Sequence, residues 1–98
     1  MMSIVWRIIT SKRVEKRLRK LPPQTLRKYQ VWLEIVETGG PQNLRQIPGF
    51  NDEALHGQLS GSRSSRLDLS TRLIYTVHQK IVTVNIEDIT AQHDYRKK

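Results

Sequence analysis

The sequence contains no cysteine, and only 6% of its 98 residues are aromatic. The absence of cysteine excludes disulfide bonds, thiolate nucleophiles and thiol-rich zinc sites, and it fits a protein of the reducing cytoplasm. No apolar run approaches the roughly 20 residues of a membrane span, and the short apolar start is interrupted by Arg7. We therefore expect no membrane segment and no secretory signal. The length predicts one domain over 1–98 with a small core.

Acidic residues are also scarce, and most of them lie in the second half of the chain. The 17 Lys and Arg residues exceed the 9 Asp and Glu residues, which gives a formal charge of +8. This excess predicts a polyanionic partner, because phosphates or an acidic protein would relieve the self-repulsion. Between residues 12 and 28 the single acid is Glu15. The nucleic-acid contacts predicted in this segment are Lys12, Arg13, Lys16, Arg17, Arg19 and Lys20. The alternative is an ordinary solvated helix face.

The first half of the chain predicts a strand followed by two helices. The strand should cover 4–9, and Ser11 is expected to cap a helix over about 12–21. Two prolines then interrupt this helix because proline lacks an amide donor, yet they suit the first turn of the next helix. The second helix should run to about Thr38, before two glycines and a proline. Its inward face is expected to carry Leu26, Tyr29, Leu33 and Val36.

The second half predicts a long loop and an antiparallel meander. The segment 42–62 has little periodicity, and connections of about 20 residues in small domains usually serve a function. Strands are expected over 64–69, 73–78 and 81–89. The order β-α-α-β-β-β predicts an α+β fold, in which a two-helix hairpin packs on one face of an antiparallel sheet and leaves the other face partly open.

Alternation in the meander predicts which side chains face the open side. The residues expected to face the helices are Leu67, Leu69, Leu73, Tyr75 and Val77. In that case Arg66 and Asp68 point away from the helices, as do Arg72 and Ile74. The arrangement requires a three-residue connection or a bulge, because a two-residue turn alone would expose one of the leucine sets.

Three groups of residues are candidates for chemistry. The planar guanidinium groups of Arg66 and Arg72 suit a phosphate or a developing phosphorane, although both could be plain surface arginines. Glu53 is a lone carboxylate ahead of the basic strands, and it is either a general base for a ribose hydroxyl or a loop cap. His56 lies close to it in sequence. At the C-terminus, His93 and Tyr95 suit proton transfer and base stacking, and the alternative is a frayed tail.

At these residues the chain resembles the RelE/ParE superfamily of toxins, and its YoeB branch most of all. The resemblance covers nearly the whole chain and depends on the order and spacing of short motifs, each of which is weak alone. These motifs are Glu53-Ala54-Leu55-His56-Gly57, Leu59-Ser60-Gly61, Ser65-Arg66-Leu67, Arg72-Leu73-Ile74-Tyr75 and His93-Asp94-Tyr95-Arg96.

The resemblance implies a RelE-like fold and a ribosome-dependent endoribonuclease that cleaves translated messenger RNA with no metal and no other cofactor. Glu53 would take the proton from a ribose 2′-hydroxyl, and Arg66 and Arg72 would stabilise the charge on the phosphoryl oxygens. His93 would protonate the leaving 5′-oxygen, and Tyr95 would orient a nucleotide. The basic first helix would dock on ribosomal RNA. Further RNA or ribosome contacts are assigned to His56, Arg63 and Arg96.

The chain departs from the family at its end, where Asp94 separates His93 from Tyr95 although YoeB-like toxins have an adjacent His and Tyr. His56 therefore stays open as the alternative acid. The family also implies a cognate antitoxin, for which an acidic or partly disordered segment would suit the charge of +8. Two other functions remain: a ParE-like toxin that inhibits DNA gyrase without nuclease activity, and a plain RNA-binding or ribosome-associated protein.

Overall fold

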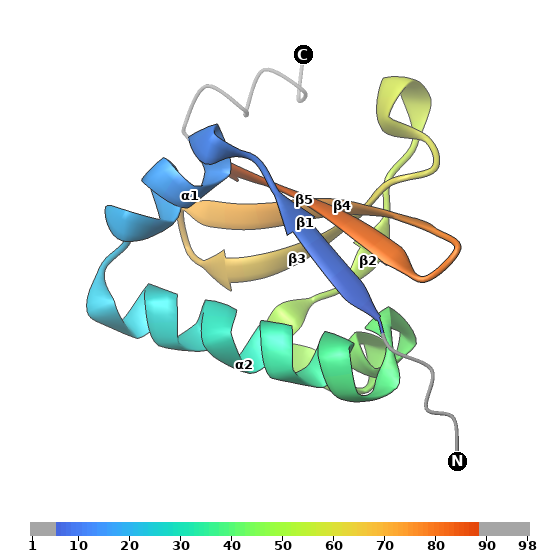
Figure 1. Cartoon of the computed structure of the whole chain (residues 1–98), viewed down its shortest axis with the longest axis horizontal. Helices are drawn as coiled ribbons and strands as arrows, with labels where there is room; N and C mark the ends of the chain where they lie inside the picture. The colour runs from blue at the N-terminus through green and yellow to red at the C-terminus, as the bar shows by residue number, and fades with distance from the viewer. Residues whose placement is uncertain (1–5, 89–98) are drawn as a thin grey trace.

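The computed structural model describes residues 6–88 of the chain. Two α-helices and a five-stranded sheet form an α+β fold, as predicted (Figure 1). The strands are β1 (Arg7–Thr10), β2 (Glu53–Ala54), β3 (Arg63–Asp68), β4 (Thr71–His78) and β5 (Ile81–Asp88). The helices are α1 (Lys12–Arg19) and α2 (Pro23–Gly39), with the short 3-10 helices η1 (Pro41–Gln46), η2 (Pro48–Phe50) and η3 (Gly57–Leu59). None of the helices within residues 6–88 is long and apolar enough to cross a bilayer.

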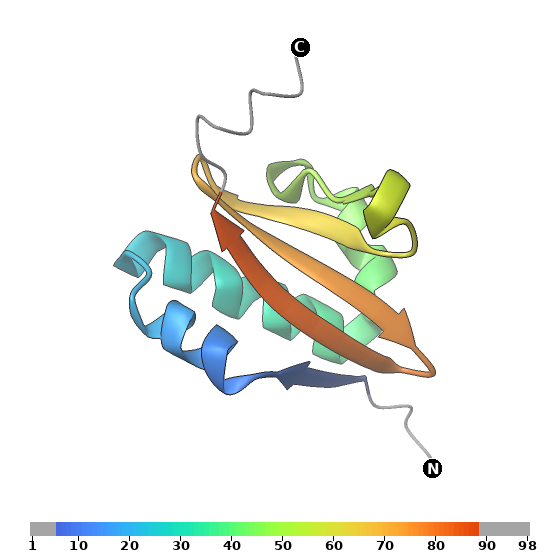
Figure 2. The ribbon, with the colours of Figure 1, turned by 90° about the horizontal axis from the view of Figure 1, so that it is seen from above.

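The sheet has the strand order β1-β5-β4-β3-β2. The predicted antiparallel meander of β3, β4 and β5 is confirmed. Two features were not predicted: β1 pairs with β5 in parallel, and β2 forms inside the segment expected to be a loop. Both α-helices pack on one face, and Figure 2 looks onto the opposite face, with α2 behind the sheet. Within the described part of the chain, no α-helix covers that opposite face.

Local signals account for the ends of the helices. The hydroxyl of Ser11 accepts a hydrogen bond of 3.1 Å from the Val14 amide, so Ser11 caps α1 as predicted. The helix α2 begins at Pro23 and ends at Gly39. The next residue, Gly40, has φ +93°, and a Cβ there would lie 2.8 Å from ring atoms of Trp6. Glycine at this position therefore allows both the turn and the close approach of the aromatic ring.

The core lies between α2 and the sheet and is centred on Trp32, which has no exposed surface. Its ring is edge-to-face with that of Tyr75 of β4, with 5.5 Å between the ring centroids. It is stacked with the ring of Tyr29, with 6.2 Å between the centroids. The prediction that Tyr29 and Val36 face inward is confirmed. The other two residues predicted for that face, Leu26 and Leu33, are only partly buried and pack against the core. The inward stripe of α2 is Thr25, Tyr29, Trp32 and Val36.

A β-bulge joins β3 to β4. The register shifts between Arg66 and Asp68, and the connection between the strands has two residues, so of the two predicted alternatives, a three-residue connection or a bulge, the structure has the bulge. In a bulge two residues oppose one, so both Leu67 and Asp68 face α2. Leu67 is buried, and the Asp68 carboxylate accepts a 2.5 Å hydrogen bond from Thr25. The predictions that Asp68 points away and that Leu69 faces the helices were wrong, because Leu69 lies in the turn and is 88% exposed.

The prediction for the rest of β4 is largely confirmed. Leu73 and Tyr75 are buried on the side of the helices. Val77 is on the same face of the strand, but it is 42% exposed, and it lines a hollow together with Trp6 and Arg45.

Candidate active site

The register of the sheet defines its uncovered face row by row. Residues that are paired on neighbouring strands project from the same face. One row consists of Arg66, Arg72 and Glu87. The adjacent row consists of Glu53, Ser64, Ile74 and Asn85, of which Ser64 and Ile74 are buried although no α-helix of residues 6–88 lies over them. The structure therefore brings Glu53 and the two arginines of the sequence prediction from three strands to one face.

Arg66 and Arg72 are direct cross-strand partners. Their Cβ atoms are thus separated by roughly 5 Å, the usual spacing of such pairs. The Nη2 atom of Arg72 lies 3.6 Å from a carboxylate oxygen of Glu87, and both side chains are partly exposed. The Nε atom of Arg72 is buried and has no hydrogen-bond partner within the described residues. Glu87 was not predicted as a site residue, and its place beside Arg72 comes from the register between β4 and β5.

Glu53 lies on β2 with an exposed side chain, in register with Ser64. Arg66 follows Ser64 by two residues on β3, so Glu53 and Arg66 are diagonal neighbours, with Cβ atoms about 7 to 8 Å apart. Both side chains are long enough to meet across that distance. The register therefore places the Glu53 side chain within reach of Arg66, with Arg72 one strand further along the same face.

Behind Glu53 lies a buried carboxylate that the sequence analysis missed. The side chain of Asp52 has no exposed surface, and it accepts three hydrogen bonds. The donors are the Nε atom of Arg63 at 2.7 Å, the hydroxyl of Ser65 at 2.8 Å and the hydroxyl of Tyr75 at 2.6 Å. The indole N–H of Trp32 in turn donates to Ser65 at 3.0 Å. Alternation along 52–53 was the available signal, because it sends the two acids to opposite faces.

The same network accounts for the place of Arg63, which was predicted to contact RNA. It is paired with Tyr75 on the helix-facing side of the sheet, apart from the row of Arg66 and Arg72. The pKa of Arg63 is raised because its contacts with Asp52 outweigh the effect of burial. Burial raises the pKa of Tyr75 well above that of a free phenol, and the hydrogen bond to Asp52 adds to the shift.

A hollow of about 210 Å³ adjoins the row that contains Glu53. It lies over β4 and β5, and the side chains on the uncovered face that line it are Ile74, Thr76, Thr83 and Asn85. The hydroxyls of Thr76 and Thr83 and the amide of Asn85 line this hollow, and β3 separates it from Glu53 on β2.

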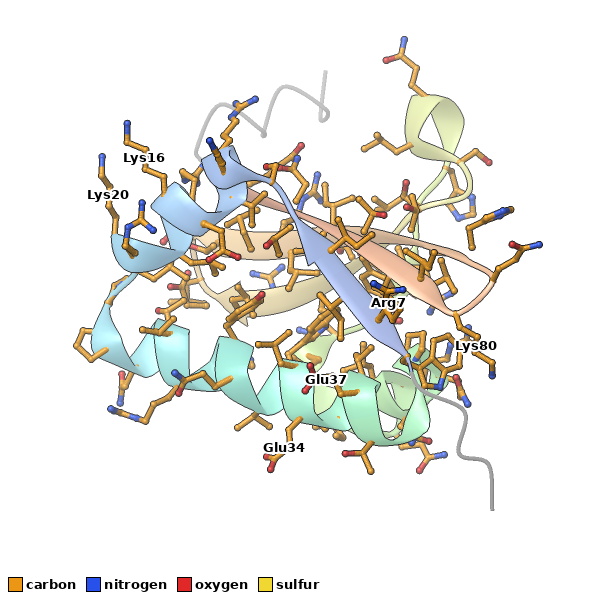
Figure 3. The ribbon with its side chains drawn as sticks, in the orientation of Figure 1. Arg7, Lys16, Lys20, Glu34, Glu37 and Lys80 are labelled. Atoms are coloured by element: carbon orange, nitrogen blue, oxygen red, sulfur yellow. The ribbon has the colours of Figure 1, made fainter. Side chains whose placement is uncertain are left out.

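Six of the basic residues predicted to bind RNA lie on α1 or directly after it. Its exposed cations are Lys12, Arg13, Lys16, Arg19 and Lys20. Lys16 and Lys20 project outward from the helix, away from the sheet (Figure 3). Arg17 is half-buried, and it donates a 3.4 Å hydrogen bond to the carbonyl of Ile86, the residue before Glu87. This contact places α1 at the same end of the sheet as the two arginines.

Other predicted residues do not join this cluster. His56 is exposed and precedes η3, in the connection between β2 and β3. His93, Tyr95 and Arg96 lie outside the described residues. Among residues 6–88, no group of three His, Cys, Asp or Glu side chains is placed to hold a metal ion.

Comparison with known proteins gives matches only at the level of structure. No protein-family model matches the chain. A search of curated protein sequences gives no match either. Solved structures, in contrast, are similar over most of the chain, and all those described below share less than a quarter of their residues with it.

The archaeal RelE-RelB complex from Pyrococcus horikoshii OT3 is 22% identical, with a TM-score of 0.69 over 90% of this chain and 99% of the other. The YoeB-YefM complex from Staphylococcus aureus is 18% identical, with a TM-score of 0.65 over 87% and 95% of the two chains. YafQ from E. coli strain BL21(DE3) is 16% identical, with a TM-score of 0.59 over 85% and 92%. The chain therefore has the RelE-like fold that the sequence resemblance implied.

Proposed function

We propose that this protein is the toxin of a bacterial type II toxin-antitoxin system and that it acts in the cytoplasm as an endoribonuclease on messenger RNA in translating ribosomes. The observation that carries the proposal is the convergence of Glu53, Arg66 and Arg72 on the uncovered face of the sheet. The RelE-like fold supports it. A fold alone does not define an activity, so the argument depends on the chemistry of these side chains.

The cleavage step follows from the residue types. Glu53 accepts the proton of a ribose 2′-hydroxyl, and the oxygen attacks the adjacent phosphorus while the bond to the 5′-oxygen breaks. The products are a 2′,3′-cyclic phosphate and a free 5′-hydroxyl. Arg66 and Arg72 stabilise the negative charge that develops on the phosphoryl oxygens. The guanidinium groups supply the positive charge, so the proposed route requires no metal ion and no other cofactor.

Two further roles are proposed for residues beyond the described part of the chain. His93 protonates the leaving 5′-oxygen, with His56 as the alternative acid, and Tyr95 orients a nucleotide. The hollow over β4 and β5 accommodates part of a nucleotide on the same face of the sheet.

The proposed partners follow from charge. The cations of α1 dock on ribosomal RNA, since they are exposed and adjoin the arginine row. RelE and YoeB of the matched structures are each in a complex, with RelB and YefM respectively. A cognate antitoxin with an acidic segment would cover the same basic surface and block the site.

The test is induced expression of the wild type and of Arg72→Ala in cells, with mapping of transcript ends. We expect new ends inside translated regions for the wild type alone. The matched control is Arg7→Ala, which removes an exposed arginine from β1 and should cleave like the wild type. Equal cleavage by Arg72→Ala would refute the role of Arg72. Trapping of DNA gyrase on DNA without RNA cleavage would favour a ParE-like toxin instead.

A further inference from the structure

Asp52 and Glu53 are adjacent acids in opposite environments. The side chain of Asp52 is fully buried, whereas Glu53 is exposed on the uncovered face. A buried carboxylate is costly unless charge and hydrogen bonds compensate it. The guanidinium of Arg63 and the hydroxyls of Ser65 and Tyr75 provide both. The position of Asp52 is therefore held firmly by groups on β3 and β4.

The strand that carries Glu53 is short. β2 has two residues and pairs with β3 through Glu53–Ser64 and Ala54–Arg63, and one more backbone hydrogen bond, of 2.9 Å from the Leu55 amide to the Ser62 carbonyl, continues the register. A ladder of this length specifies register weakly, and a slip of one residue would turn Glu53 toward the helices. Because neighbouring residues of an extended segment project to opposite faces, holding Asp52 inside keeps Glu53 outside.

The network also links the base to the arginine row. Ser65, which donates to Asp52, immediately precedes Arg66 on β3. The hydrogen bond from Ser65 to Asp52 thus connects the residue before Arg66 with the residue before Glu53. The indole N–H of Trp32 donates to the same Ser65 hydroxyl from the core. The segment before Asp52 is held separately, since Lys28 donates a 2.6 Å hydrogen bond to the carbonyl of Gly49.

We propose that Asp52 is a positioning residue, which through Arg63, Ser65 and Tyr75 holds Glu53 at the distance from Arg66 that cleavage requires. This inference rests on the proposed function, in which Glu53 is the general base. Asp52 itself lies on the covered side and does not touch RNA.

The experiment compares four proteins: the wild type, Asp52→Asn, Glu53→Gln and the double variant. Single-turnover cleavage of a defined message on purified ribosomes gives the rate, and binding to the same ribosomes gives the affinity. Misplacement of a reacting group by about 1 Å costs up to about 100-fold in rate, so Asp52→Asn should cleave about 10- to 100-fold more slowly with unchanged affinity. The double variant should cleave no more slowly than Glu53→Gln, because the group that Asp52 positions is already gone.

Two controls separate positioning from stability. Val36→Ala removes a fully buried core side chain outside the network, and below its unfolding temperature it should cleave at the wild-type rate. Tyr75→Phe removes one of the three hydrogen bonds but keeps the Arg63 ion pair, so it should fold even if Asp52→Asn does not. Its cleavage rate should fall, by less than that expected for Asp52→Asn.

The outcomes are distinct for the two proposals. If Asp52→Asn and Tyr75→Phe both cleave at the wild-type rate, the positioning role is overturned and the nuclease proposal stands. The same holds if the rate losses of Asp52→Asn and Glu53→Gln multiply in the double variant. Undiminished cleavage by Glu53→Gln would remove the proposed base and the positioning role together. Absence of cleavage by the wild type would refute the nuclease itself.

Discussion

Arg66 of β3 and Arg72 of β4 stand directly opposite each other on the uncovered face of the sheet. Like charges in this arrangement destabilise an antiparallel pair, and the carboxylate of Glu87 compensates Arg72 from a distance of 3.6 Å. A phosphate bound between the two arginines would offset their repulsion, because both guanidinium groups would attract the same anion. The pair is thus better suited to an anion than to the stability of the sheet, and this conflict can be measured.

Arg66→Gln should separate stability from activity. Loss of the repulsion should raise the free energy of unfolding by a few tenths of a kcal/mol. Loss of a group that stabilises transition-state charge should slow cleavage about 100-fold or more. Urea denaturation and single-turnover cleavage measure the two effects, with Arg7→Gln as the matched control that changes neither. A less stable Arg66→Gln protein with normal cleavage would argue that the arginine is structural.

The basic face of α1 predicts the salt dependence of ribosome binding. Each phosphate contact contributes about one unit to the slope of log affinity against log salt. The double variant Lys16→Gln/Lys20→Gln should therefore bind more weakly and lower that slope by about two units. Lys80→Gln is the control, because its ammonium lies over the Trp6 ring at 4.3 Å, away from α1 (Figure 3). An unchanged slope in the α1 variant would exclude these lysines from the interface.

Alkaline pH should destabilise the fold through Tyr29. Burial raises the pKa of Tyr29 to about 12, and the charges of Glu15 and Glu37 contribute. An unfolded tyrosine titrates near 10, so this stabilisation is complete below about pH 10 and is lost as the pH rises through about 12. Urea denaturation between those values should show the decline. In Tyr29→Phe the free energy of unfolding should decline less steeply with pH. An equally steep decline would show that other groups govern alkaline unfolding.

The bulge in β3 predicts that two leucines only two residues apart contribute very differently to the free energy of unfolding. Leu67→Ala should cost about 2 to 5 kcal/mol, because Leu67 is buried against the core. Leu69→Lys should change the free energy of unfolding by less than about 0.5 kcal/mol, since the side chain lies in the turn. Chemical denaturation of both variants measures the difference. The reverse order of losses would mean that the register of the hairpin is other than described.

The parts of the fold that could be predicted depend on local signals. Ser11 caps α1 through an amide three residues away, and the prolines between the helices act within one turn. The period of two in the meander placed Arg66 and Arg72 on one face, and the same reasoning allowed either a three-residue connection or the bulge that is observed. Each of these conclusions concerns residues that are close together in the chain.

The long connection shows where sequence reasoning failed. Its only strand is two residues long, which is too short for a period to be recognised, so β2 was missed while Glu53 within it was identified by residue type. Trp32 was missed for a related reason. The apolar residues of α2 fit two adjacent faces of the helix equally well. Only the packing of Trp32 against Tyr75 of β4 selects the face that is buried.

The sequence by itself determined the order of the two α-helices and the four longer strands, the charge of the chain and the residue types available for phosphate chemistry, because periodicity, capping and composition act over a few residues. Only the tertiary structure decided that β1 lies beside β5, that Glu87 meets Arg72 and that Asp52 is buried beneath Glu53. These relationships join residues from different strands. They arise from hydrogen-bond pairing and core packing, which no local pattern specifies.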